Sequence, residues 1–157
     1  MVIMDKSESL FPTAPKAPKS VLFVCSRNAC RSPMAHAMAE KLCRRRVYID
    51  SVGLHPGDLD GFSIAVMSEL GLDITNHVPK AISEVDPRDF DLVVSLTPES
   101  HHQLMEYLSG DAVAVEYWPT FDPSTAKGNR DQILGTYRHV RDQLKAQIER
   151  RFCFKKS

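Results

Sequence analysis

A cysteine, an arginine and a serine lie close together near the start of the sequence, in the stretch CSRNACRS at residues 25–32. Cys25 follows the apolar run SVLFV, and Arg31 and Ser32 come six and seven residues after it. A thiolate is a strong nucleophile, and a planar guanidinium can hold two oxygens of a tetrahedral oxyanion. The spacing indicates a site in which Cys25 attacks an oxyanion that Arg31 holds.

The elements on either side of this stretch decide whether those groups meet. SVLFV (20–24) is typical of a buried strand, and from Pro33 the apolar residues recur at helical spacing. A loop between a strand and the start of a helix can curl its backbone amides around one point, which creates an anion site and favours a thiolate there. Besides Cys25 and Arg31, we expect this phosphate-binding loop (P-loop) to contain Ser26, Arg27, Asn28, Ala29, Cys30 and Ser32.

Three polar residues, Ser32, Asn28 and Asp122, can assist Cys25 and Arg31. Ser32 can donate its hydroxyl proton to the thiolate, and Asn28 is one of the few non-glycine types that tolerate a positive φ in a tight loop. Asp122 stands in the segment FDPS. A thiolate that attacks phosphorus must expel an alkoxide or phenoxide, which is easier when a nearby acid supplies a proton. We expect Asp122 to be this acid and afterwards to activate water.

The rest of the chain alternates predicted strands and helices. Further strands are predicted over 47–53, 89–96 and 112–118, and helices over Pro33 to about 44–46, 62–71, 98–110 and 130–152. Such alternation implies right-handed crossovers and a parallel sheet, with ligands bound at the carboxyl ends of the strands. We therefore predict an α/β fold, a doubly wound four-stranded parallel sheet with helices on both faces.

Length and charge limit the possible classes of protein. The 157 residues suit one domain, and the 20 Lys and Arg residues balance the 20 Asp and Glu residues, so neither nucleic acid nor an anionic membrane is favoured as a partner. Residues 1–19 are expected to be a flexible leader before a domain over 20–157. No run has the length of a signal peptide core or a membrane span, which favours a cytoplasmic location.

In that compartment the four cysteines are expected to be thiols. Their spacings match no zinc pattern, and we expect no metal and no cofactor. Cys43 and Cys153 are expected to pack in the core or to be incidentally exposed. For Cys30, simple packing and a redox role beside Cys25 both remain open, because geometry decides between them.

The segment VLFVCSRNACRSPMA, together with the late pair DP, resembles the low-molecular-weight protein tyrosine phosphatases and the related thioredoxin-type arsenate reductases. These proteins share one fold, and the similarity extends from about Ser20 to Phe152. The resemblance implies that the chain adopts the same fold and that it acts on phosphate or arsenate.

The resemblance also implies a role for each matching residue. Cys25 would be the nucleophile, Arg31 the oxyanion clamp and Asp122 the general acid and base. The supporting roles would fall to Ser32 as the hydrogen-bond donor to the thiolate, Asn28 as the organiser of the loop, and His77 as a support behind it. Cys30 stands where many phosphatases of the family have a loop cysteine that bonds reversibly to the nucleophile under oxidation.

The sequence also departs from both branches. Many tyrosine-directed members have aromatic residues after Asp-Pro, where this chain has Ser124 and Thr125. Thioredoxin-coupled reductases relay oxidation through two cysteines after the third strand, and here Thr97 stands where the first is expected. A triple-cysteine relay is therefore not expected.

We accordingly expect a cysteine-dependent phosphatase that hydrolyses phosphotyrosine-type aryl phosphate monoesters through a cysteinyl-phosphate intermediate. Its partners would be phosphotyrosine proteins or small aryl phosphates. Two alternatives remain open. One is an arsenate reductase in which a small-molecule thiol such as glutathione resolves the adduct, and the other is a catalytically silent module that binds phosphate or arsenate.

Overall fold

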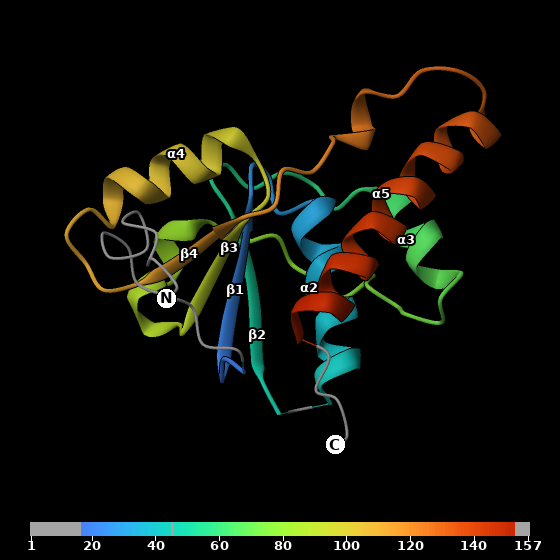
Figure 1. Cartoon of the computed structure of the whole chain (residues 1–157). Helices are drawn as coiled ribbons and strands as arrows, with labels where there is room; N and C mark the ends of the chain where they lie inside the picture. Colours follow the sequence, from blue (N-terminus) through green and yellow to red (C-terminus); the bar gives the residue numbers. More distant parts are fainter. Residues whose placement is uncertain (1–16, 45, 153–157) are drawn as a thin grey trace, which may run out of the picture.

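A parallel β-sheet forms the centre of the computed structural model, which describes residues 17–44 and 46–152 (Figure 1). Its strands are β1 Ser20–Cys25, β2 Tyr48–Gly53, β3 Leu92–Ser95 and β4 Ala114–Tyr117. Their order across the sheet is β2-β1-β3-β4, and every neighbouring pair is parallel. The chain thus moves outward from β1 in both directions, which creates a topological switch point at the carboxyl end of β1.

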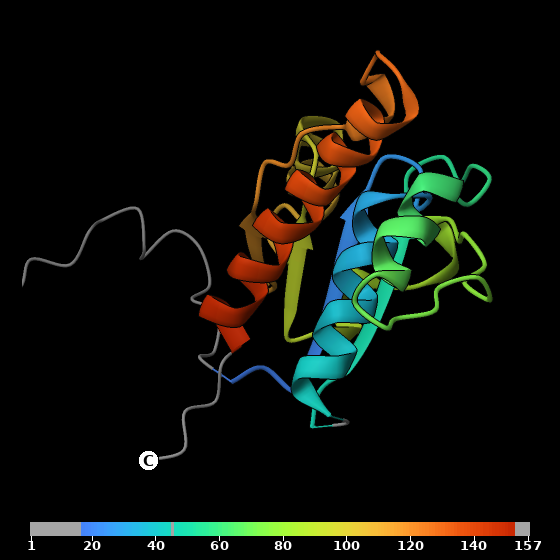
Figure 2. The same cartoon turned by 90° about the vertical axis from the view of Figure 1, so that its right-hand side faces the viewer.

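Helices cover both faces of this sheet (Figures 1 and 2). On one face lie α2 Arg31–Cys43, α3 Gly61–Ser68 and α5 Arg130–Phe152, and on the other lies α4 Pro98–Tyr107. Short 3-10 turns occupy Ile82–Glu84, Pro87–Asp89 and Pro123–Thr125. The predicted fold class, a doubly wound four-stranded parallel sheet with helices on both faces, is confirmed.

The central strand β1 is buried on both sides. Phe23 faces the layer of α2 and α5, where its ring packs edge-on against Trp118 and Phe152 at centroid distances of 5.9 and 6.5 Å. Leu22, its neighbour in sequence, belongs to the hydrophobic cluster on the other face of the sheet. Packing from both sides fixes the strand, and with it the position of Cys25 at the end of β1.

Several elements differ from the predicted boundaries. Helix α2 begins at Arg31 instead of Pro33, so the arginine belongs to the first helical turn. Strand β3 is shorter than the predicted 89–96, because Pro87–Asp89 form a 3-10 turn that the carboxylate of Asp86 caps. Strand β4 is shorter than the predicted 112–118. The predicted helices over 62–71 and 98–110 end at Ser68 and Tyr107.

Parts of two expectations fall outside the described residues. Of the predicted leader over 1–19, only 17–19 are described, and Cys153 is not described, so both expectations stay predictions. No helix within the described ranges is long and apolar enough to span a bilayer.

Candidate active site

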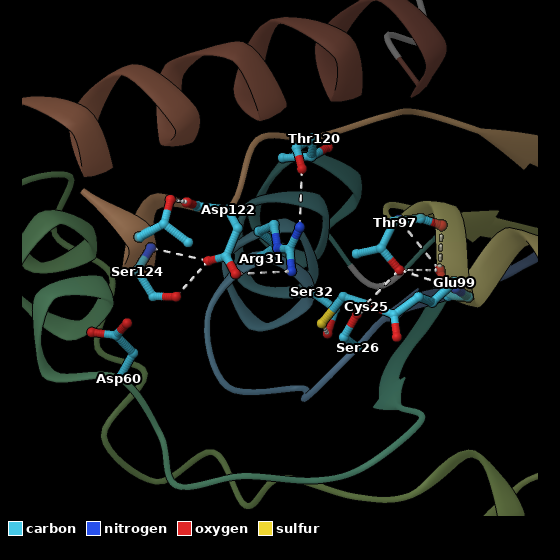
Figure 3. Close-up of polar contacts among 12 residues, drawn as sticks. Cys25, Ser26, Arg31, Ser32, Asp60, Thr97, Glu99, Thr120, Asp122 and Ser124 are labelled. Atoms are coloured by element: carbon cyan, nitrogen blue, oxygen red, sulfur yellow. Dashed lines mark hydrogen bonds and ion pairs between the residues drawn. The ribbon is translucent and has the colours of Figure 1, made fainter.

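Cys25 lies at the carboxyl end of β1, at the base of the loop that leads into α2 (Figure 3). Its side chain is buried, with 2% of its surface exposed. The sulfur Sγ lies 2.9 Å from Ser32 Oγ, and the backbone N–H of Asn28 donates to it at 3.2 Å. Both groups can donate hydrogen bonds to the one buried sulfur.

The carboxamide of Asn28 sets the direction of these hydrogen bonds. Asn28 has a positive φ of 50° and is fully buried. The side-chain atom that accepts from the backbone N–H of Lys80, at 3.0 Å, must be the oxygen Oδ1. The other terminal atom of the carboxamide is therefore the nitrogen Nδ2, which donates to Ser32 Oγ at 2.7 Å. Because Ser32 Oγ accepts from Asn28, its own proton remains available for Cys25.

His77 lies behind the loop, with Nε2 2.9 Å from Asn28 Oδ1. Burial lowers the pKa of His77, and the nearby His36, whose ring centroid is 6.0 Å away, lowers it further. The ring is therefore neutral near pH 7 and donates from Nε2 to the carboxamide. His36 in turn contacts Ser51 Oγ through Nδ1 at 2.8 Å.

The loop is shaped by its contacts with the segment 54–60 that follows β2. Four of its carbonyls, those of Cys25, Ser26, Arg27 and Ala29, accept from backbone N–H groups of this segment at 2.8–3.1 Å. In a trans peptide the N–H points opposite to the carbonyl, so the following amides point away from this segment. A Cβ on Gly53 would lie 2.5 Å from Arg27 C, which explains the glycine at this close approach. The loop amides are thus left available for the predicted anion-binding nest.

Arg31, in the first turn of α2, and Asp122, in the loop after β4, point toward each other (Figure 3). Arg31 Nη2 lies 3.7 Å from Asp122 Oδ2, and Nη1 donates to the backbone carbonyl of Thr120 at 3.0 Å. The other oxygen of Asp122, Oδ1, accepts from the backbone N–H of Ser124 at 3.0 Å and from its hydroxyl at 2.6 Å. The Arg31 side chain is 11% exposed and that of Asp122 40% exposed. The predicted clamp and acid are therefore both in the same pocket as Cys25.

This pocket has a volume of about 230 Å³. Among the described residues its lining contains no aromatic side chain and consists of Cys25, Arg27, Ala29, Cys30, Arg31, Asp58, Asp60, Asp122 and Ser124. The charged side chains among these residues suit the binding of an oxyanion. Among residues 17–44 and 46–152, no group of three or more His, Cys, Asp or Glu side chains is arranged to hold a metal.

Two acidic residues of this pocket, Asp58 and Asp60, are absent from the predicted site. Asp60 Oδ1 accepts from the backbone N–H of Phe62 at 2.8 Å, and Oδ2 accepts from the hydroxyl of Tyr137 at 2.5 Å. The sequence carried one signal for them, since the segment PGDLDG follows β2 and must lie at the same edge of the sheet as Cys25.

The second loop cysteine, Cys30, is 9% exposed and packs in the hydrophobic core. Burial raises the pKa of its thiol well above the ordinary range, so Cys30 is protonated at neutral pH. Cys43 is 1% exposed and also lies in the core. Of the cysteines in the described part of the chain, Cys25 is the one whose sulfur accepts a hydrogen bond from a backbone N–H of the loop. Its sulfur also contacts Ser32 Oγ.

Thr97 occupies a structural position at the start of α4. It is 2% exposed, its Oγ1 accepts from the backbone N–H of Ser100 at 3.1 Å, and it caps the helix. Ser26 Oγ, beside the nucleophile, donates to Thr97 Oγ1 and to Glu99 Oε1, each at 3.3 Å. On the side of the site that faces α4, the described residues therefore supply hydroxyls and a carboxylate, and no thiol besides Cys25.

The strand-loop-helix site and the doubly wound sheet define a class of cysteine-dependent enzymes that bind tetrahedral oxyanions. Residues 20–152 match the family described as "Low molecular weight phosphotyrosine protein phosphatase", and the chain belongs to this family. The match leaves out only the first 19 residues and the last five.

Individual relatives are more specific than the family description. The chain is 33% identical over 131 residues to the "Glutaredoxin arsenate reductase" of Synechocystis sp. (strain ATCC 27184 / PCC 6803 / Kazusa), which covers 83% of this chain and 94% of the relative. The solved structure "An arsenate reductase in oxidized state" superposes with a TM-score of 0.74 at 30% identity, covering 86% of this chain and 97% of that one. A tyrosine phosphatase of Erwinia amylovora superposes with a TM-score of 0.70 at 19% identity, covering 87% and 91%.

These comparisons overturn the expectation of a phosphatase that hydrolyses aryl phosphate monoesters. The arsenate reductases named here are at least 30% identical to this chain, whereas the likeness to the tyrosine phosphatase, at 19%, shows the fold alone. The physical reason for the error is that the cysteine, arginine and aspartate serve any tetrahedral oxyanion. The alternative, arsenate reduction, agrees better with the comparisons.

Proposed function

We propose that this protein is an arsenate reductase in which Cys25 attacks arsenate and a small-molecule thiol resolves the adduct. The observation that carries the proposal is the hydrogen-bonded sulfur of Cys25 at the base of a pocket that, in the described part of the chain, is lined by charged and small side chains and by no aromatic one. The similarity to arsenate reductases over more than four fifths of the chain supports it.

The first step joins arsenic to the enzyme. The Cys25 thiolate forms an S–As bond, and one As–O bond breaks. Asp122 protonates the departing hydroxide, which leaves as water. Arg31 turns from Asp122 and Thr120 to the arsenate oxygens, and the loop amides stabilise the remaining negative charge.

The second step transfers two electrons to arsenic. An external thiolate attacks Cys25 Sγ, so that an S–S bond forms and the S–As bond breaks with its electron pair left on arsenic. As(V) thereby becomes As(III) and leaves as arsenite. A second thiol then cleaves the mixed disulfide on Cys25. The sum is one arsenate and two thiols converted into arsenite, one disulfide and water.

The thiols of the described residues favour an external reductant. Cys30 lines the pocket, but burial keeps it protonated and so makes it a poor attacking group. Cys43 is enclosed in the core, and Thr97 caps α4. A thiol-dependent enzyme of this kind also needs a reducing compartment, and we propose a cytoplasmic location for that reason.

The test is arsenite production from arsenate and glutathione, quantified together with glutathione disulfide. We expect one disulfide for each arsenite in the wild type, no turnover in Cys25→Ser, and wild-type rates in Cys43→Ala, whose thiol lies outside the pocket. The proposal fails if the wild type yields no arsenite with glutathione and with 2-mercaptoethanol while it hydrolyses p-nitrophenyl phosphate in a Cys25-dependent reaction.

A further inference from the structure

The charged side chains that line the pocket divide into two groups. They are Arg27, Arg31, Asp58, Asp60 and Asp122. Arg31, Asp60 and Asp122 are held by the protein contacts described above. Arg27 and Asp58 form no ion pair and no side-chain hydrogen bond with any residue of 17–44 or 46–152, and their side chains are exposed. One positive and one negative charge at the pocket mouth are therefore free.

The two free charges lie on neighbouring backbone segments. The carbonyl of Arg27 accepts from the backbone N–H of Gly57 at 3.0 Å. The Arg27 side chain folds over the same glycine, since a Cβ on Gly57 would lie 2.5 Å from Arg27 Nη2 and 2.6 Å from Nε. Asp58 is the next residue. Because Gly57 has no side chain, the Arg27 guanidinium can lie against it, next to Asp58 at one rim of the pocket.

We propose that Arg27 and Asp58 bind the zwitterionic α-amino acid group of the thiol that resolves the Cys25 adduct. Arg27 would bind the α-carboxylate through its planar fork, and Asp58 would bind the α-ammonium. The substrate class is a thiol that carries both charges on one carbon, as the γ-glutamyl end of glutathione does. The proposal rests on the proposed function, because it names the second substrate of that reaction.

Other thiols fit this rim less well. A neutral thiol leaves both charges unused, a thiol with only a carboxylate meets the repulsion of Asp58, and a thiol with only an ammonium meets that of Arg27. Arg31 and Asp122 are already assigned to arsenate. These positions also suit the proposed order, in which arsenate reacts with Cys25 before the thiol arrives. Cys25 lies at the buried base of the pocket, while Arg27 and Asp58 are exposed at its mouth.

The first experiment measures thiol selectivity in arsenate reduction. The KM for glutathione is divided by the KM for 2-mercaptoethanol in the wild type, Arg27→Gln and Asp58→Asn. Each exposed pair is worth a factor of roughly two to five, so each variant should raise this ratio by roughly two- to fivefold. The matched controls are Arg150→Gln and Asp89→Asn, which are exposed at the opposite edge of the sheet and should leave the ratio unchanged. Equal ratios in all five proteins would overturn the proposal.

The second experiment does not depend on arsenate. S-methylglutathione keeps the zwitterion but has no thiol, so it should slow the alkylation of Cys25 by iodoacetamide, followed by mass spectrometry of the Cys25 peptide. We expect protection in the wild type and weaker protection in Arg27→Gln and Asp58→Asn. Absence of protection in the wild type contradicts the zwitterion site. Protection without any arsenite production would instead sink the proposed function alone.

Discussion

Arg31 and Asp122 face each other across the pocket, with Nη2 of the guanidinium 3.7 Å from Oδ2 of the carboxylate. The residue proposed to hold the oxyanion is thus paired, before any anion enters, with the residue proposed to supply the proton. An incoming arsenate must compete with Asp122 for the guanidinium. Once Arg31 turns to the anion, Asp122 loses its ion-pair partner and faces the bound anion.

Replacement of Asp122 by Asn should therefore separate binding from catalysis. The variant removes the competitor, so it should bind arsenate and phosphate roughly two- to fivefold more tightly, the value of a partly exposed ion pair. Loss of the acid should slow arsenite production by roughly 10²-fold or more. Calorimetric titration and steady-state kinetics measure the two effects, with the exposed Asp131→Asn as control. Weaker anion binding in Asp122→Asn would contradict this account.

Replacement of Arg31 by Lys tests the planar fork. Lysine keeps the positive charge but cannot hold two oxygens in parallel, and it loses one charge-assisted hydrogen bond. We expect the KM for arsenate to rise by roughly tenfold or more, which corresponds to at least about 1.5 kcal/mol. Arg150→Lys, at the far end of α5, is the matched control. A KM within twofold of the wild type would rule out bidentate binding by Arg31.

Asn28 allows a comparison of backbone strain with hydrogen bonding. Its φ is 50°, and its buried side chain contacts Ser32, His77 and the backbone of Lys80. Asn28→Gly should lose the side-chain contacts and about 1–3 kcal/mol of stability. Asn28→Ala should lose roughly 1 kcal/mol more, because alanine resists positive φ. Urea denaturation provides both values, and equal midpoints for the two variants would show that φ strain is absent.

The pH dependence of stability should report on His77. Its pKa is lower in the folded protein than in the unfolded chain, because of burial and the nearby His36. The unfolded chain therefore binds a proton at a pH at which the folded protein does not, and stability falls as the pH drops below about 6.5. In His77→Gln, the decline of the urea midpoint from about pH 7 to about pH 5 should be smaller. The exposed His139→Gln should decline as the wild type does, and an unchanged decline in His77→Gln would refute the assignment.

Glu69 links α3 to α5 and has the opposite pH behaviour. Hydrogen bonds from Arg138 and Arg141 lower the pKa of its carboxyl from 4.5 to about 2. A carboxyl with a lowered folded-state pKa stabilises the protein above its unfolded pKa and loses this effect as the pH falls toward 2. Glu69→Gln should therefore lower the urea midpoint at neutral pH, and its difference from the wild type should shrink with acidification. Glu149→Gln serves as control, and a pH-independent difference would exclude the carboxylate as the cause.

The sequence predicted the core of the site because that part is local. Cys25, the loop, Arg31 and Ser32 lie within eight consecutive residues between a buried strand and a helix, so chain connectivity alone brings them together. The same patterns predicted the fold, since alternating strands and helices allow few topologies. Strand ends were less predictable. For β3, the turn at Pro87–Asp89 competes with the strand and shortens it.

Which side chains form the walls of the pocket depends on the tertiary structure. Asp58 and Asp60 line the same pocket as Cys25 because β2 pairs with β1, which sets the segment 54–60 against the loop carbonyls. Asp122 reaches Arg31 because β3 and β4 extend the sheet on the other side. The motif by itself indicated chemistry on any tetrahedral oxyanion. The lining and charge of the pocket depend on side chains that come together only when the sheet assembles.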